Sequence, residues 1–277
     1  MSTSHPRLVN AQWLAAHLQE PTVRVVDATV HLTFDADGAH TESGRETYRE
    51  AHVPGAVFVD QLIDLSVHDG EAPFEAAPSE QVARVLGEAG IGNDHTVVVY
   101  DSVNGIWATR LWWQLRLEGH DDVVVLDGGL KAWQEAGRPV ESGDLTNPAA
   151  TFTARRRPEL VASTADVETA TADASVLLIN ALDRDSFAAG RIPSSVNVPF
   201  PELVDDQGRL RSLDELRPLF ESVGALDPEV TPVSYCGGGI AATAVAFALQ
   251  GLGREVRVYD GSMNAWTSDP ARPLEQG

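Results

Sequence analysis

Short runs of β-branched residues alternate along the chain with longer amphipathic stretches. Residues 23–26, 57–59, 97–100 and 123–126 have the length and composition of buried strands, and residues 79–88 and 108–117 repeat apolar side chains at helical spacing. This alternation is typical of an α/β fold in which a mostly parallel sheet carries helices on both faces. In such sheets ligands bind beyond the carboxyl ends of the strands.

The pattern occurs twice. Residues 123–133 read VVVLDGGLKAW and residues 256–266 read VRVYDGSMNAW, while HVPGAVFV at 52–59 is answered by RIPSSVNV at 191–198. A strand ending in VVYD at Asp101 is matched by one ending in VSYC at Cys236. These matches fall in the same order, which indicates a tandem duplication. We therefore predict a first module over residues 12–140, a linker over 141–163 and a second module over 164–277.

The amino-acid composition argues against several classes of function. The 277 residues are 43% hydrophobic, enough for two compact domains. A formal net charge of −21 disfavours binding to nucleic acid or to an anionic membrane surface. No run approaches the roughly 18 apolar residues of a membrane span, and residues 1–10 lack a signal-peptide core, so we expect a cytoplasmic protein. The single cysteine excludes an intramolecular disulfide, and no Cys/His grouping has the spacing of zinc ligands.

That cysteine, Cys236, lies where a strand is expected to end and three glycines lead into a predicted buried helix over residues 241–252. Consecutive glycines adopt conformations closed to other residues, so several N–H groups can turn toward the sulfur. Together with the helix N-terminus, they would stabilise a thiolate and then a negatively charged persulfide. We predict that Cys236 is catalytic. The predicted substrate-binding residues of the loop are Gly237, Gly238, Gly239, Ile240 and Ala241.

Two other chemistries use a glycine-rich loop between a strand and a helix. A nucleotide-binding P-loop ends in a Lys-Ser/Thr pair, which this loop lacks. A cysteine-dependent phosphatase needs an arginine about six residues after the cysteine to clamp the phosphoryl group. Here Ala242 occupies that position, so phosphatase chemistry is the less favoured alternative.

The chain resembles the tandem-domain rhodanese-type sulfurtransferases, the family of thiosulfate and 3-mercaptopyruvate sulfurtransferases. The resemblance covers nearly the whole chain and is carried by HVPGAVFVD, GHDDVVVLDGGLKAW, RIPSSVNVPF, YCGGGIAA and VYDGSMNAW. It implies two rhodanese-like modules, of which the second is catalytic. The first, with Asp101 at the position of the cysteine, is implied to be non-catalytic.

The resemblance also implies a double displacement. The Cys236 thiolate would take a sulfur atom from a donor, hold it as a persulfide and pass it to cyanide or a thiol, without a metal or organic cofactor. Members that prefer thiosulfate usually carry basic side chains after the cysteine, and those that prefer 3-mercaptopyruvate usually read Cys-Gly-Ser-Gly. This loop matches the second type at Gly237 and Gly239 but has Gly238 in place of the serine. We favour 3-mercaptopyruvate as the small-molecule donor, with thiosulfate as the alternative.

A second departure concerns the segment that opens the second module. The family typically reads Asp-Ala-Arg there and uses the arginine on an anionic substrate, whereas this chain reads Asn-Ala-Leu at 180–182. Arg184 or Arg191 could supply the missing charge; a surface arginine paired with a carboxylate is the plainer interpretation of each. The missing arginine and serine also leave open a non-catalytic module that relays persulfide from a desulfurase to a partner.

Overall fold

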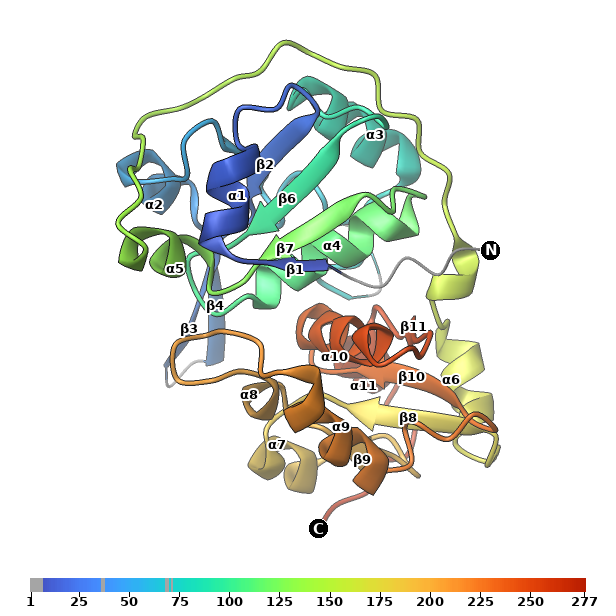
Figure 1. Cartoon of the computed structure of the whole chain (residues 1–277). Coiled ribbons are helices and arrows are strands. Elements are labelled where there is room, and N and C mark those ends of the chain that lie inside the picture. The colour runs from blue at the N-terminus through green and yellow to red at the C-terminus, as the bar shows by residue number, and fades with distance from the viewer. Residues whose placement is uncertain (1–6, 36–37, 68–69, 71) are drawn as a thin grey trace.

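The computed structural model describes residues 7–35, 38–67, 70 and 72–277, and these form two α/β modules stacked on one another (Figure 1). The first sheet contains β1 (Arg7–Val9), β2 (Val23–Asp27), β5 (Val57–Phe58), β6 (Thr96–Tyr100) and β7 (Val123–Leu126). The second contains β8 (Val176–Asn180), β9 (Val196–Asn197), β10 (Thr231–Tyr235) and β11 (Arg257–Val258). A hairpin of β3 (Val30–Asp35) and β4 (Gly38–Ser43), which the sequence pattern did not predict, extends from the first module.

Both sheets are parallel throughout. Their strand orders are β1-β7-β6-β2-β5 and β11-β10-β8-β9. The helices of the first module are α1 (Ala11–His17), α2 (Arg45–Glu50), α3 (Ser79–Glu88), α4 (Ile106–Leu117) and α5 (Gly129–Glu135). Those of the second are α6 (Thr164–Ala170), α7 (Arg184–Ala189), α8 (Phe200–Leu203), α9 (Leu213–Ser222), α10 (Ile240–Gly251) and α11 (Ser262–Thr267). The predicted α/β class, with two mostly parallel sheets flanked by helices, is confirmed.

Alternation along the strands builds three apolar layers. In β6, Val97 and Val99 face one way and Val98 and Tyr100 the other, because successive side chains of a strand point to opposite faces. The outer face of each sheet has its own core. The inner faces share one continuous core that runs through both modules. The interface between the modules is therefore built like the interior of a single domain.

Helices α4 and α10 form the centre of this interface. The ring of Trp112 on α4 meets that of Phe247 on α10 edge to face, with centroids 4.9 Å apart. Every residue of α10 from 241 to 250 is buried, since its own sheet covers one side and α4 the other. Thr109 and Thr243, which occupy equivalent positions in the two copies, face each other with their hydroxyl oxygens 3.5 Å apart. The modules are thus related by an approximate two-fold axis between these threonines.

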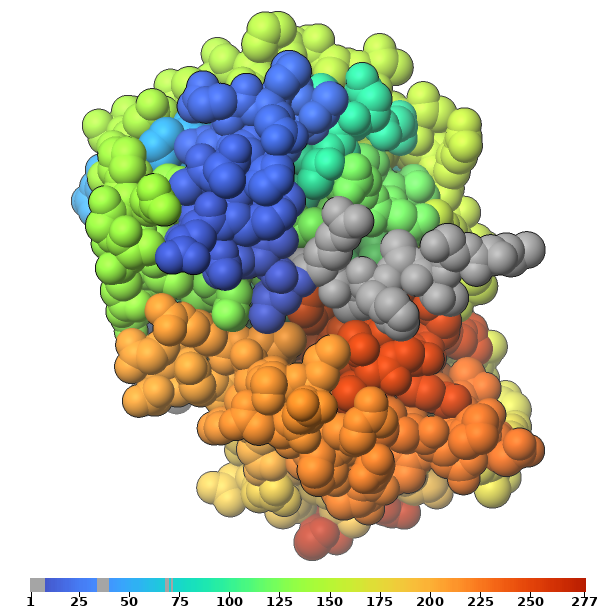
Figure 2. Space-filling view, viewed as in Figure 1, coloured from blue at the N-terminus to red at the C-terminus, as the bar shows by residue number. Residues whose placement is uncertain are grey.

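Each module covers the strand ends of the other in the same way. The Asp260 carboxylate, after β11, accepts a hydrogen bond from the N–H of Ala76 of the first module (2.7 Å). Asp127, its equivalent after β7, accepts one from the N–H of Leu210 of the second module (3.2 Å). Ala76 and Leu210 lie three residues before α3 and α9, respectively. Figure 2 shows the segment around Leu210, in orange, closed against the first module.

The segment between the modules is a long extended strap that passes over the first module (Figure 1). It is tied down by backbone hydrogen bonds, including those from Ala150 to Gly87 and from Arg155 to Glu118. Phe152 within it is buried. A single 3-10 turn, η1 (Pro158–Leu160), precedes α6. The strap therefore contributes to the packing of the first module although its sequence has no apolar periodicity.

Candidate functional site

Cys236 lies directly after β10, at the carboxyl edge of the second sheet, and only 3% of its surface is exposed. Its N–H donates to the Ser262 hydroxyl oxygen (3.1 Å), and its carbonyl accepts from the N–H of Met263 (3.0 Å). The carbonyl of Gly237 accepts from Asn264 (2.9 Å). The cysteine is therefore held from its backbone by the start of α11, while Gly237 and Gly238 on its other side are only half-buried.

The loop after Cys236 turns into α10 at Gly239. Gly239 has φ +82° and caps the helix, a left-handed conformation that favours glycine. The first N–H groups of a helix have no acceptor within it, so Ile240, Ala241 and Ala242 contribute free donors at this end of α10. The helix N-terminus also carries a partial positive charge. Ile240 and Ala241 thus lie in the first turn of α10, and the three glycines connect this turn to Cys236.

The equivalent loop of the first module shows what such a loop encloses. Asp101 follows β6 and is 2% exposed, and Gly105 (φ +84°) caps α4 as Gly239 caps α10. The carboxylate of Asp101 accepts five backbone N–H groups, at distances from 2.9 to 3.1 Å: those of Val103, Asn104, Gly105, Trp107 and Ala108. A strand, loop and helix of this design therefore form a complete anion cradle around the first side chain after the strand.

The side chains that face Gly237 and Gly238 of the Cys236 loop are uncharged. A side chain at Gly237 would meet Leu182 at 3.9 Å. One at Gly238 would meet the ring of Phe74, from the first module, at 3.0 Å and the amide of Asn264 at 3.1 Å. The absence of a side chain at Gly238 therefore makes room for a loop of the first module beside the Cys236 loop.

Arg184 and Arg191, the two predicted anion-binding residues, both have carboxylate partners. The Arg184 side chain is 68% exposed and pairs with Glu202 at 2.6 Å. Arg191 is paired with Glu275 at 3.5 Å and donates to the carbonyl of Gly277 at 2.8 Å. Arg191 thus fastens the C-terminal segment to the second module. The role of either arginine toward a donor stays a prediction.

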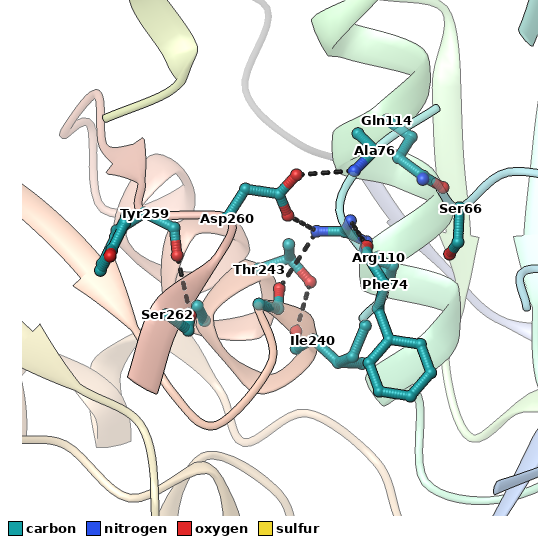
Figure 3. A network of polar contacts seen from close by, with 12 residues as sticks. Ser66, Phe74, Ala76, Arg110, Gln114, Ile240, Thr243, Tyr259, Asp260 and Ser262 are labelled. Atoms are coloured by element: carbon teal, nitrogen blue, oxygen red, sulfur yellow. Dashed lines mark hydrogen bonds and ion pairs between the residues drawn. The ribbon is translucent and has the colours of Figure 1, made fainter. Parts of the chain in front are cut away.

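Sequence reasoning missed three residues that shape the loop: Arg110, Phe74 and Ser262. Figure 3 shows Arg110, on α4 of the first module, reaching Asp260 of the second. Asp260 was assigned no role from the sequence. A comparison of the two copies would have found Arg110, because its counterpart in the second copy is Ala244.

Two features are absent from the residues that the structure describes. No group of three or more His, Cys, Asp and Glu side chains among them is arranged to hold a metal ion. In the same part of the chain, no helix combines the length and the apolarity needed to span a bilayer.

Known proteins match this chain over nearly its full length. The family model of the rhodanese-like domain matches residues 10–136 and again residues 163–269. A 3-mercaptopyruvate sulfurtransferase of Escherichia coli is 33% identical over 96% of this chain and 97% of its own length. Thiosulfate/3-mercaptopyruvate sulfurtransferase 1 of Arabidopsis thaliana is 31% identical, with 99% of this chain and 79% of the relative covered.

Solved structures agree. The crystal structure of SseA from Escherichia coli, described as a 3-mercaptopyruvate sulfotransferase with the rhodanese fold, superposes with a TM-score of 0.85 at 33% identity. The match covers 93% of this chain and 98% of SseA. On the two domain matches and these full-length relatives, the chain belongs to the tandem-domain rhodanese-type sulfurtransferase family.

Proposed function

We propose that the protein transfers sulfane sulfur through a persulfide on Cys236, with the second module as the catalytic one. The observation that carries this proposal is the anion cradle of the first module, in which five N–H groups close on the Asp101 carboxylate. Cys236 holds the equivalent place before a similarly capped helix. A thiolate, and then a persulfide, would be the anion that the second loop stabilises.

The reaction has two displacements. The Cys236 thiolate attacks the sulfur of 3-mercaptopyruvate, the carbon–sulfur bond breaks, and its electron pair leaves as the enolate of pyruvate, which takes up the thiol proton. Cyanide or a thiolate then attacks the outer sulfur of the persulfide, the sulfur–sulfur bond breaks, and the Cys236 thiolate returns. With thiosulfate as donor, the leaving group is sulfite.

We favour 3-mercaptopyruvate over thiosulfate as the donor. The side chains nearest to Gly237 and Gly238, which include Leu182 and Asn264, are uncharged, and this supports the choice because a dianion is better bound by basic side chains. The Escherichia coli relative is named for 3-mercaptopyruvate, whereas the name of the Arabidopsis relative gives both donors. The loop N–H groups would hold the sulfur, and the half-buried faces of Gly237 and Gly238 would leave access for a small donor. Arg184 and Arg191 remain the candidates for its carboxylate.

The test is the formation of thiocyanate from cyanide with each donor, by the wild type and by Cys236→Ser. We expect turnover that is faster with 3-mercaptopyruvate and lost in the serine variant. Without cyanide, mass spectrometry should detect the gain of one sulfur atom on the wild type alone. Turnover that persists in Cys236→Ser would contradict the proposal, and thermal unfolding checks that the variant is folded.

A persulfide relay is the second candidate function. The ion pairs that already engage Arg184 and Arg191 favour it, because they leave an anionic donor with fewer cations. A relay would accept sulfur from a cysteine desulfurase but show no steady-state turnover with small donors. The same assays distinguish the two functions. Hydrolysis of an aryl phosphate is not expected, since buried Ala242 stands where a phosphatase needs its arginine.

A further inference from the structure

Arg110 is the buried cation that joins the two modules at the catalytic loop. It lies on α4 of the first module and is 1% exposed. Its Nη1 donates to Oδ1 of Asp260 (2.5 Å) and to the carbonyl of Gly239 (3.2 Å), and its Nη2 donates to the carbonyl of Phe74 (2.6 Å). The guanidinium also lies over the ring of Trp113, 4.7 Å from its centroid. One side chain of the non-catalytic module thus binds three groups around the catalytic loop (Figure 3).

One of these contacts holds Gly239, the residue at which the loop turns into α10. Gly239 is the cap of α10 and the last residue of the glycine run. It packs so closely on Asp260 that an added Cβ would lie 2.3 Å from the Asp260 carbonyl oxygen and 2.8 Å from Oδ1. The other carboxylate oxygen of Asp260 accepts from Ala76. The first module therefore holds both Asp260 and the Gly239 carbonyl, and with them the orientation of the following N–H groups.

The duplication supplies an internal control. Asp127 is equivalent to Asp260 and accepts from Leu210 as Asp260 accepts from Ala76. The residue at the position of Arg110 in the second copy is Ala244, which has no guanidinium to reach Asp127. The reciprocal backbone contact is therefore present on both sides of the two-fold axis. On the side of Asp127 the nearby arginine is Arg209, which is 40% exposed and pairs with Glu135. The buried arginine on the central helix is found on the side with the cysteine.

We propose that Arg110 is a positioning residue for the catalytic loop of the neighbouring module. It holds Gly239 and Asp260 in the arrangement that turns the N–H groups at the start of α10 toward the Cys236 sulfur. This proposal rests on the proposed function of Cys236. It assigns the non-catalytic module a part in the reaction, because that module completes the geometry of a loop that it does not contain.

The test compares Arg110→Lys with Arg116→Lys. Arg116 lies on the same helix, donates to Gln250 across the interface (2.7 Å) and stacks over Trp112 at 5.1 Å, but its contacts are at the far end of α10. Both substitutions keep the charge and remove one guanidinium from the interface. Loss of interface stability alone would affect both variants, whereas loss of loop geometry would affect only Arg110→Lys.

The first readout is the rate of Cys236 alkylation by iodoacetamide as a function of pH. Because the chain has one cysteine, this signal is unambiguous and does not require turnover. Charged groups facing the loop are Arg110, Asp260 and Glu75, whose Oε1 lies 3.0 Å from a Cβ placed at Gly261. We expect Arg110→Lys to raise the midpoint of the profile by about one pH unit, because fewer aligned donors stabilise the thiolate. Arg116→Lys should leave it unchanged.

The second readout is steady-state kinetics. Arg110→Lys should lower kcat about tenfold and change KM less than about twofold, since the donors act on the reacting sulfur. A folded Arg110→Lys protein with the wild-type alkylation profile would overturn the proposal. If this variant does not fold, Arg110→Met combined with Asp260→Asn removes both buried charges and is measured instead. Failure of both to fold while Arg116→Lys folds would assign Arg110 to stability and also overturn it.

The outcomes separate this proposal from the proposed function. A wild type without sulfurtransferase turnover would contradict the proposed function and leave the alkylation comparison intact. A wild type with turnover, together with identical alkylation profiles for all variants, would contradict the role of Arg110 alone.

Discussion

The loops that follow β6 and β10 come from one ancestral design and differ in what they enclose. In the first module the loop is one residue longer, and five N–H groups close on Asp101. In the second module the loop is a run of glycines around a cysteine, braced from outside by Arg110. A cradle that carries its own carboxylate is already complete. One that must take up and release sulfur needs its shape to be held by something else.

Substitution of Gly105 or Gly239, the left-handed glycine of each loop, should show this difference most strongly. Gly239→Ala combines φ +82° with a Cβ 2.3 Å from the Asp260 carbonyl, so we expect unfolding free energy to fall by about 4 kcal/mol and activity to be lost. Gly105→Ala has φ +84° but no atom nearer than 4.0 Å, so strain alone should cost about 1 kcal/mol. Urea denaturation of both variants measures the contrast. Equal losses would show that the two loops are equally tightly packed.

Replacing the enclosed carboxylate should have the next largest effect. In Asp101→Asn the amide nitrogen faces N–H donors that now lack an acceptor, so we expect a loss of about 3 kcal/mol in stability. The Cys236 alkylation profile should stay as in the wild type. Urea denaturation and alkylation are measured on the same preparation. A shifted profile would mean that the two loops are coupled through the interface.

A third contrast lies at the ends of β2 and β8, where Asp27 in the first copy corresponds to Asn180 in the second. Both use Oδ1 to accept the N–H two residues later, from Thr29 and from Leu182. Burial raises the pKa of Asp27 from 3.8 to about 6, although hydrogen bonds from Thr29 lower it. Below pH 3.8 the carboxyl is protonated in both states; stability falls as pH rises toward 6, and the full penalty is present above it.

Asp27→Asn removes that penalty, so it should stabilise the protein by about 2 kcal/mol at pH 8 and by little at pH 4. The reciprocal variant, Asn180→Asp, should introduce a similar loss that grows with pH. Urea midpoints at the two pH values test both. A gain for Asp27→Asn that is the same at pH 4 and pH 8 would show that charge is not the cause.

The smallest effects are expected at two ion pairs of the second module, that of exposed Arg184 and that of partly buried Arg191. Arg184→Ala and Arg191→Ala should each raise KM for 3-mercaptopyruvate by about twofold, because Glu202 and Glu275 already neutralise the two charges. A rise of tenfold or more in a folded variant would instead identify that arginine as a direct ligand of the donor carboxylate. An uncharged disulfide reagent as thiol probe provides the control, since its reaction rate should not change.

Much of the fold could be predicted because short sequence patterns indicate where strands and helices lie. The strand over 123–126 and the helix over 79–88 were predicted with their observed bounds. Apolar periodicity, and the glycines at which an element ends, can be recognised within a few residues. The hairpin of β3 and β4 was missed although residues 30–35 alternate apolar and polar side chains; its two strands pair only with each other, in a sheet separate from the other two. The strap was expected to be a linker; backbone hydrogen bonds to α3 and α4, buried Phe152 and the ion pair of Arg156 with Glu118 hold it in place.

The sequence by itself determined that the protein has two copies of one module, that Cys236 follows a strand in the second and that Asp101 replaces it in the first. Repeated motifs, and glycines between a strand and a helix, are short stretches of sequence, so they can be recognised without the structure. Only the tertiary structure decided which groups brace the catalytic loop. Arg110 and Asp260 are 150 residues apart, and Ala76 and Asp260 are 184 apart. Their meeting depends on how two buried helix faces pack across an approximate two-fold axis, which no periodicity along the chain records.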